Sequence, residues 1–154
     1  MKVYVIGSGA MGSLFAGHLA KSGVDVVIAE RNPDIANQIL NSGLRLTGVR
    51  GKLTVKIPVV MKTQADPSAD LVIVCVKAYD TAAAVDQHLD LLKSAALVLS
   101  IQNGIGNIEE IAGRIGEESI LAGTTTMGSF SVAPGIVNHV GDGETVPSRH
   151  LQRD

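Results

Sequence analysis

The feature that most constrains the fold is a glycine-rich run near the start of the chain, Gly7-Ser8-Gly9-Ala10-Met11-Gly12. Its spacing is G-x-G-x-x-G. The apolar residues 3–6 come directly before it, and residues 10–22, with apolar side chains at helical spacing, follow. A strand, a glycine turn and a helix in this order predict the first half of a Rossmann βαβ unit, which binds a dinucleotide.

Each glycine of the run has a physical reason to be there. Gly7 permits a tight turn, Gly9 lets the backbone approach a pyrophosphate, and Gly12 allows close packing of helix on strand. The helix N-terminus offers N–H groups and a partial positive charge to phosphates. The alternative is a glycine-rich turn that serves packing only. The flanking strand and helix favour dinucleotide binding, with candidate cofactor residues Gly7, Ser8, Gly9, Ala10, Met11 and Gly12.

The rest of the chain alternates apolar segments with helical patterns. Apolar residues at 24–29, 71–76 and 97–101 predict buried strands, and helices are expected to begin near Pro33, Asp80 and Asn107. We predict an α/β fold of the Rossmann type, a doubly wound and mainly parallel sheet. Residues 44–60 alternate between apolar and polar and predict a half-exposed β-excursion, and strand-like segments return at 120–122 and 136–140. Residues 1–146 are expected to form one NAD(P)-binding domain, and the polar residues 147–154 a disordered tail.

Composition narrows the function. The net charge of −2 and an aromatic content of 3% give no support to nucleic-acid binding. No targeting signal or long apolar segment is present in the sequence, so no membrane partner is expected. The single cysteine, Cys75, lies in an apolar segment and is predicted to be a packing residue in a cytoplasmic protein. No set of side chains has metal-site spacing.

The second predicted strand ends at Glu30-Arg31, where a Rossmann domain contacts the adenosine ribose. A carboxylate at this position accepts hydrogen bonds from the ribose hydroxyls of NAD, whereas an arginine pairs with the 2′-phosphate of NADP. Both residue types are present, so their position alone does not choose between the cofactors. The alternative for Arg31 is a solvated surface charge.

Three more segments follow or end predicted strands: Val76-Lys77-Ala78-Tyr79, Gln102-Asn103-Gly104-Ile105-Gly106 and Gly123-Thr124-Thr125-Thr126. Taken alone, Lys77 could be a solvated lysine and Asn103-Gly104 an ordinary turn. Together with the glycine run, the segments resemble the ketopantoate reductase family, the NADPH-dependent 2-dehydropantoate 2-reductases of pantothenate synthesis. The resemblance covers residues 1–146.

The resemblance implies roles for individual residues. Arg31 falls at the family's 2′-phosphate position, which favours NADP over NAD, although Glu30 is less typical of the family. Lys77 matches a lysine beside the cofactor, Asn103 an asparagine between nicotinamide and substrate, and Ser129 a residue at the nicotinamide end. The implied reaction moves a hydride from NADPH to the C2 carbonyl of a small-molecule 2-oxo acid.

The family's catalytic lysine belongs to a helical second domain, which we expect to lie beyond this chain's C-terminus. No catalytic residue is therefore assigned within the chain, and the apolar face that such a domain would cover could support self-association. Three alternatives stay open: a reductase of another 2-oxo acid, a non-catalytic NADP(H)-binding module, and a fragment without function of its own.

Overall fold

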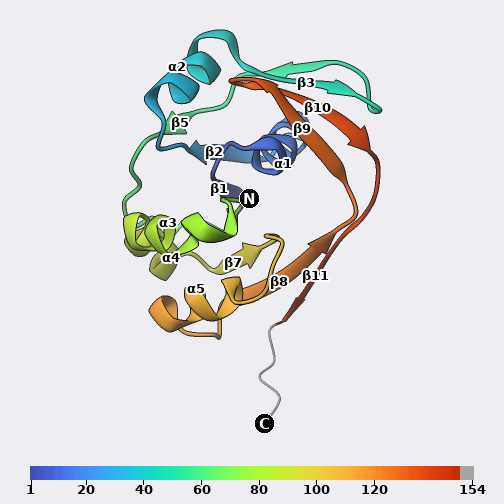
Figure 1. Ribbon diagram of the computed structural model, residues 1–154. Coiled ribbons are helices and arrows are strands. Elements are labelled where there is room, and N and C mark those ends of the chain that lie inside the picture. Colours follow the sequence, from blue (N-terminus) through green and yellow to red (C-terminus); the bar gives the residue numbers. More distant parts are fainter. Residues whose placement is uncertain (150–154) are drawn as a thin grey trace.

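The computed structural model describes residues 1–149, which form two β-sheets and the helices around them (Figure 1). The helices are α1 (Ala10–Lys21), α2 (Pro33–Ser42), α3 (Thr81–Gln87), α4 (Leu89–Ser94) and α5 (Asn107–Ile115), with a short 3-10 helix η1 (Ala78–Asp80). The larger sheet contains β1 (Lys2–Ile6), β2 (Asp25–Ala29), β5 (Val59–Val60), β6 (Leu71–Val74), β7 (Leu97–Ser100), β8 (Ile120–Thr125) and β11 (Thr145–Arg149). The smaller sheet contains β3 (Leu44–Gly48), β4 (Leu53–Val55), β9 (Gly128–Ala133) and β10 (Ile136–Gly141).

The larger sheet has the strand order β11-β8-β7-β6-β1-β2-β5. Every pairing within it is parallel except that of β11 with β8. Parallel strands need crossover connections, and the helices that supply them bury both faces of the sheet. The mainly parallel α/β fold predicted from the sequence is confirmed.

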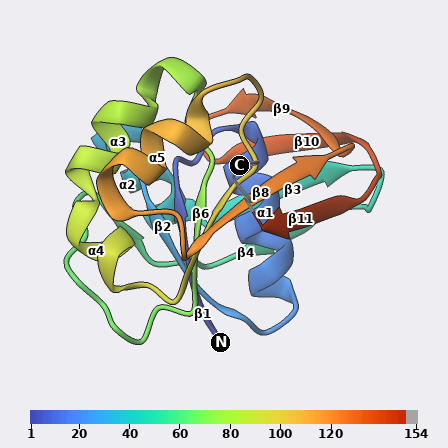
Figure 2. The same cartoon turned by 90° about the horizontal axis from the view of Figure 1, so that it is seen from below.

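Two apolar cores lie on opposite faces of the larger sheet. Figure 2 shows α3, α4 and α5 on one side and α1 with the smaller sheet on the other. The first core joins sheet residues to α1, α2 and the smaller sheet, and its fully buried members include Val3, Val5, Leu14, Ile28, Ile39 and Val137. The second core joins the sheet to α3, α4 and α5 through residues that include Val72, Val85, Leu92 and Ile111.

The smaller sheet has the strand order β4-β3-β10-β9 and packs on α1. A Cβ added at Gly17 of α1 would lie 2.6 Å from Leu46 Cδ1, so the absence of a side chain lets the helix approach β3 closely. The β-excursion predicted over residues 44–60 is present as β3, β4 and β5. The parallel pairing of β3 with β10, about 90 residues away along the chain, was not predicted.

The helix starts differ in how well they were predicted. Helix α2 begins at Pro33 as expected, and the preceding Asn32, a residue type favoured at helix caps, accepts hydrogen bonds from the N–H groups of Asp34 and Ile35. Asp80 makes no capping bond, and the helix expected after it is divided into α3 and α4 at His88. Helix α5 begins at Asn107 as expected, but the spacing of Asn107 and Glu110, which is that of a capping box, does not form one. Gly106 occupies the cap of α5 with φ +94°, and the Asn107 side chain bonds to other residues.

The disordered tail expected from residue 147 is wrong for residues 147–149, which belong to β11 and pair with residues 121–123 of β8. Pairing with a sheet edge satisfies backbone groups and needs no apolar side chains, so a polar segment can form this strand. Pro147 is tolerated because the strand lies at the edge of the sheet. The remaining residues of the expected tail, 150–154, lie outside the described part of the chain.

Candidate functional site

The candidate site lies where β1, β2, β6 and β7 end, at the carboxyl edge of the larger sheet. The chain passes from β1 to β2 on one side, while β6 flanks β1 on the other, so this is the switch point at which α/β sheets bind ligands. A cavity of about 640 Å³ opens there. Nine of the ten predicted site residues line it, namely Gly7, Ser8, Gly9, Ala10, Met11, Arg31, Lys77, Asn103 and Ser129.

The glycine loop has one glycine that the fold itself does not require. Gly7 has φ +94°, and a Cβ at Gly12 would lie 1.9 Å from the carbonyl oxygen of Gly7, so both positions need glycine for internal reasons. Gly9 has an ordinary φ of −64°, and a Cβ there would meet nothing within 4 Å. The open space at Gly9 borders the cavity and is where phosphate groups of a cofactor would fit.

The N-terminus of α1 is suited to an anion. Its cap, Gly9, makes no side-chain capping bond, and the first turn contains no acidic residue. The N–H groups of the first turn therefore have no side-chain acceptor and remain available to a pyrophosphate. Ser13 Oγ donates to the carbonyl oxygen of Ser8 at 2.9 Å and holds the loop against the helix. The residues at this end of the cavity fit a dinucleotide.

Glu30 is buried, and its carboxylate is hydrogen-bonded to residues of the same chain. Its carboxylate accepts hydrogen bonds from the N–H and the hydroxyl of Ser8 and, at 2.8 Å, from the N–H of Asn32. An ionised carboxylate can accept about four hydrogen bonds. Glu30 therefore fixes the glycine loop and the start of α2, with room for about one more donor such as a ribose hydroxyl. The sequence correctly placed this residue directly after the second strand, but its bonds to Ser8 were not foreseen.

Arg31 forms an ion pair across the end of β1 with Asp80, which was predicted as a helix start and not as a site residue. Its Nη2 atom lies 3.0 Å from Oδ2 of Asp80, at the end of η1 beyond β6. The Arg31 side chain is 63% exposed and that of Asp80 is 23% exposed. Because β1 lies between β2 and β6, this ion pair spans the strand that leads into the glycine loop.

Lys77 and Asn103 are exposed at the other end of the cavity, and a partly buried hydrogen-bond network joins their segments. Gln102 Nε2 donates to the carbonyl oxygen of Val76 at 2.7 Å and to Thr81 Oγ1 at 2.8 Å. Thr81 in turn donates to Asn107 Oδ1 at 3.1 Å. A further bond, also of 3.1 Å, runs from Asn107 Nδ2 to the carbonyl oxygen of Asn103.

Sequence reasoning missed this network, although one signal was available. Gln102 is a polar residue at the end of a buried strand, directly before the predicted Asn103. The two groups to which its Nε2 donates lie more than 20 residues away, so no local pattern identifies them.

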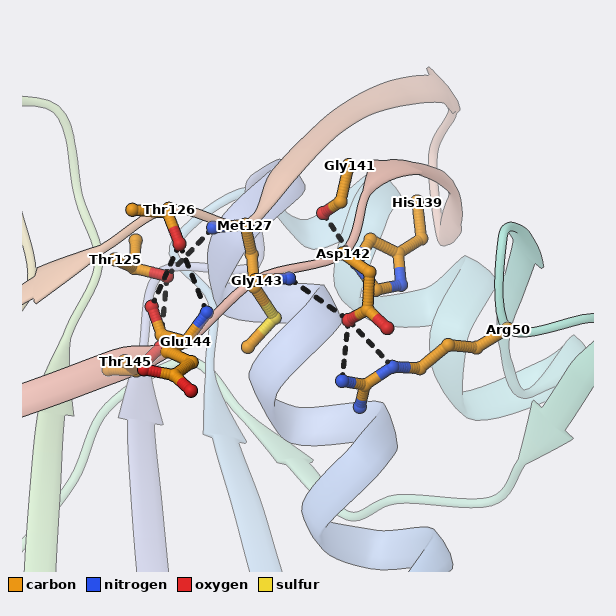
Figure 3. A network of polar contacts seen from close by, with 10 residues as sticks. All are labelled: Arg50, Thr125, Thr126, Met127, His139, Gly141, Asp142, Gly143, Glu144 and Thr145. Atoms are coloured by element: carbon orange, nitrogen blue, oxygen red, sulfur yellow. Dashed lines mark hydrogen bonds and ion pairs between the residues drawn. The ribbon is translucent and has the colours of Figure 1, made fainter.

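The turn between β8 and β9 brings Ser129 to the glycine loop, where its Oγ donates to Met11 Sδ at 3.0 Å. Figure 3 shows how this turn is held. The N–H of Thr126 donates to the carbonyl oxygen of Glu144 and the N–H of Glu144 to Thr126 Oγ1, each at 3.0 Å. The β8–β9 turn is thereby fixed to the connection between β10 and β11, which Arg50 also holds through Asp142.

Two titratable groups on the cavity wall are neutral at physiological pH. Burial raises the pKa of the Cys75 thiol to about 12, which agrees with its prediction as a packing residue rather than a nucleophile. Burial lowers the pKa of His88, whose Nδ1 lies 2.8 Å from Thr63 Oγ1.

Within residues 1–149, no helix has the length and apolar character needed to span a membrane.

The comparisons with known proteins agree with one another. A family model described as ketopantoate reductase PanE/ApbA matches residues 3–151. The chain is 39% identical over 154 residues to 2-dehydropantoate 2-reductase of Halobacterium salinarum, covering 97% of this chain and 50% of that relative. It is 38% identical over 146 residues to the protein of the same name in Pyrococcus abyssi, covering 95% of this chain and 47% of that relative. The chain thus spans about half the length of these curated relatives.

Solved structures with similar folds include two relevant proteins. 2-dehydropantoate 2-reductase from Geobacter metallireducens has a TM-score of 0.88 at 27% identity, covering 100% of this chain and 51% of that one. D-mandelate dehydrogenase, solved with NADH and anilino(oxo)acetate, has a TM-score of 0.90 at 28% identity, covering 99% of this chain and 49% of that one.

Proposed function

The chain belongs to the ketopantoate reductase PanE/ApbA family, and from that premise we propose that it supplies the NADP(H)-binding part of a 2-dehydropantoate 2-reductase. The observation that carries the proposal is the space left open at Gly9, beside an uncapped helix N-terminus and the exposed guanidinium of Arg31. The fold requires no glycine at this position, and a bound pyrophosphate would explain one.

Each end of the cavity has a distinct role in this proposal. Residues 7–12 hold the pyrophosphate through backbone N–H groups, and Arg31 pairs with the 2′-phosphate that distinguishes NADP from NAD. Lys77, Asn103 and Ser129 line the nicotinamide end, where Asn103 also contacts the substrate. The bound cofactor supplies the hydride that reduces the C2 carbonyl of the 2-oxo acid. The proposal assigns no general acid to this chain.

The pathway and location follow from the same proposal. Reduction of 2-dehydropantoate to pantoate belongs to pantothenate biosynthesis, and we place the protein in the cytoplasm. A second candidate, a reductase of another 2-oxo acid, is favoured by the similarity to D-mandelate dehydrogenase. The two candidates share the cofactor site and differ in substrate, so a panel of 2-oxo acids assayed with NADPH on a full-length relative separates them.

Calorimetric titration of this chain with NADPH, and separately with NADH, tests the proposal. We expect both to bind, NADPH more tightly because only its 2′-phosphate can use Arg31. Binding with no turnover of 2-dehydropantoate, even after a complementing helical domain is supplied, would favour a non-catalytic NADP(H)-binding module. If neither cofactor binds to the folded chain, the cofactor site and the function built on it are wrong.

A further inference from the structure

The ion pair between Arg31 and Asp80 occupies the position where the proposed cofactor is discriminated. Arg31 follows β2 and Asp80 ends η1, so the pair connects the two walls of the cavity over the end of β1. Both residues line the cavity. The guanidinium that would recognise a 2′-phosphate is therefore already engaged by a carboxylate of its own chain.

Asp80 and a 2′-phosphate cannot both make full use of this guanidinium. Arginine recognises phosphate best through two parallel N–H donors, and the 3.0 Å contact commits Nη2 to Asp80. The carboxylate would also lie close to a phosphate that carries charge of the same sign, and the repulsion disfavours binding of the phosphate. NADH has a hydroxyl in place of that phosphate and leaves the ion pair undisturbed.

Glu30 does not compete with Asp80 for the Arg31 guanidinium, because its carboxylate is hydrogen-bonded to other residues. Its carboxylate is buried and accepts hydrogen bonds from Ser8 and Asn32, and no bond from Arg31 is found among the described residues. Asp80, by contrast, is partly exposed, and its side chain makes no capping bond to α3. The Asp80 side chain therefore does not stabilise a loop or a helix start, as the hydrogen bonds of Glu30 do.

We propose that Asp80 sets the preference between the two nicotinamide cofactors by competing with the 2′-phosphate for Arg31. This inference rests on the proposed function and names a specificity-determining residue within it. The competition lowers the affinity for NADPH and leaves the affinity for NADH unchanged, so the chain discriminates less between the two cofactors than Arg31 alone would allow.

The test measures dissociation constants for NADPH and NADH by calorimetry on the full chain and on D80N. The substitution keeps the size of the side chain and removes its charge. We expect D80N to bind NADPH up to about fivefold more tightly, the upper end of the strength of one exposed ion pair, with the NADH constant unchanged within error. The control is D90N, which removes the same charge from an exposed position on α4. It should change neither constant.

The double variant R31A/D80N distinguishes competition from a general effect of charge. Competition requires that D80N give a clearly smaller gain in NADPH affinity once Arg31 is removed, because only the relief of charge repulsion between Asp80 and the phosphate then remains. An equal gain in both backgrounds, or no gain in either, would overturn the role of Asp80 while the cofactor site itself stood. Failure of the original chain to bind either cofactor would instead overturn the proposed function, and this inference with it.

Discussion

Gly9 and Gly12 belong to one motif, but the packing of the protein itself requires glycine only at Gly12. Gly12 is enclosed by its own chain, because a Cβ there would overlap the carbonyl oxygen of Gly7, whereas a Cβ at Gly9 would enter open space. We expect Gly12→Ala to destabilise the fold by about 1–3 kcal/mol or more, since the overlapping atom belongs to the backbone. Gly9→Ala should change stability by less than about 1 kcal/mol and weaken NADPH binding.

Urea unfolding and calorimetric titration of both variants check this pair of predictions. Each variant serves as the control for the other, because both add one methyl group to the same loop. Equal destabilisation by the two substitutions would show that Gly9 is also enclosed by the protein, and the argument for a ligand at that position would then fail.

Arg31→Ala belongs to the same scale. Loss of a hydrogen bond to a charged group costs about 1.5–3 kcal/mol, so the affinity for NADPH should fall by a factor of roughly ten to one hundred. The affinity for NADH should stay within about twofold. Arg45→Ala is the matched control, since Arg45 is exposed on β3. An equal loss for both cofactors would make Arg31 a structural residue and leave the preference for NADP unsupported.

At the scale of elements, His88 lies at the junction of α3 and α4 and packs against Thr63, in the connection between β5 and β6. Burial holds the pKa of His88 below its usual value of 6.5, and that of His18 in α1 is lowered in the same way. The unfolded chain therefore takes up protons first as the pH falls, and the free energy of unfolding decreases below about pH 6.5. Well above that pH the contribution of these two histidines is constant.

Urea unfolding between pH 7.5 and 5.5 measures this effect. We expect His88→Gln to lose less stability than the original chain over this interval, because glutamine can still bond to Thr63 but does not titrate. Parallel pH profiles for the two proteins would show that His88 is not protonated on unfolding in this range.

At the scale of the whole molecule, strand β9 forms one edge of the smaller sheet and carries exposed apolar side chains. Phe130 is 49% exposed and Val132 is 58% exposed. An apolar strand edge favours pairing with another chain, so we expect this chain to self-associate at high concentration. The double variant Phe130→Ser/Val132→Ser should shift the sedimentation profile toward the monomer.

Met61→Ser is the control for this prediction, since Met61 is also 49% exposed but does not belong to β9. If the control suppresses association as strongly as the β9 variant does, general surface hydrophobicity is responsible. If the original chain is monomeric at all concentrations, the exposed edge has no such consequence.

Several elements of the fold and the site could be predicted from the sequence, because they depend on residues that are close together along the chain. The strand, glycine loop and helix of residues 3–22 are neighbours along the chain, as are Asn32 and the helix it caps. The segments at Lys77 and Asn103 could be placed at one edge of the sheet because parallel strands share the edge at which they end. These inferences need only the repeat of side chains along an element and the turn that follows it.

The tertiary structure alone decided how distant segments meet. It paired β3 with β10, gave β8 a polar neighbour in β11, and brought Ser129 to Met11, 118 residues away. It also placed Asp80 against Arg31 and surrounded Glu30 with bonds from the glycine loop. No repeat or motif records such contacts, because each depends on the packing of whole elements. The candidate site residues could therefore be identified from the sequence, whereas the residues that bond to them were determined by the tertiary structure.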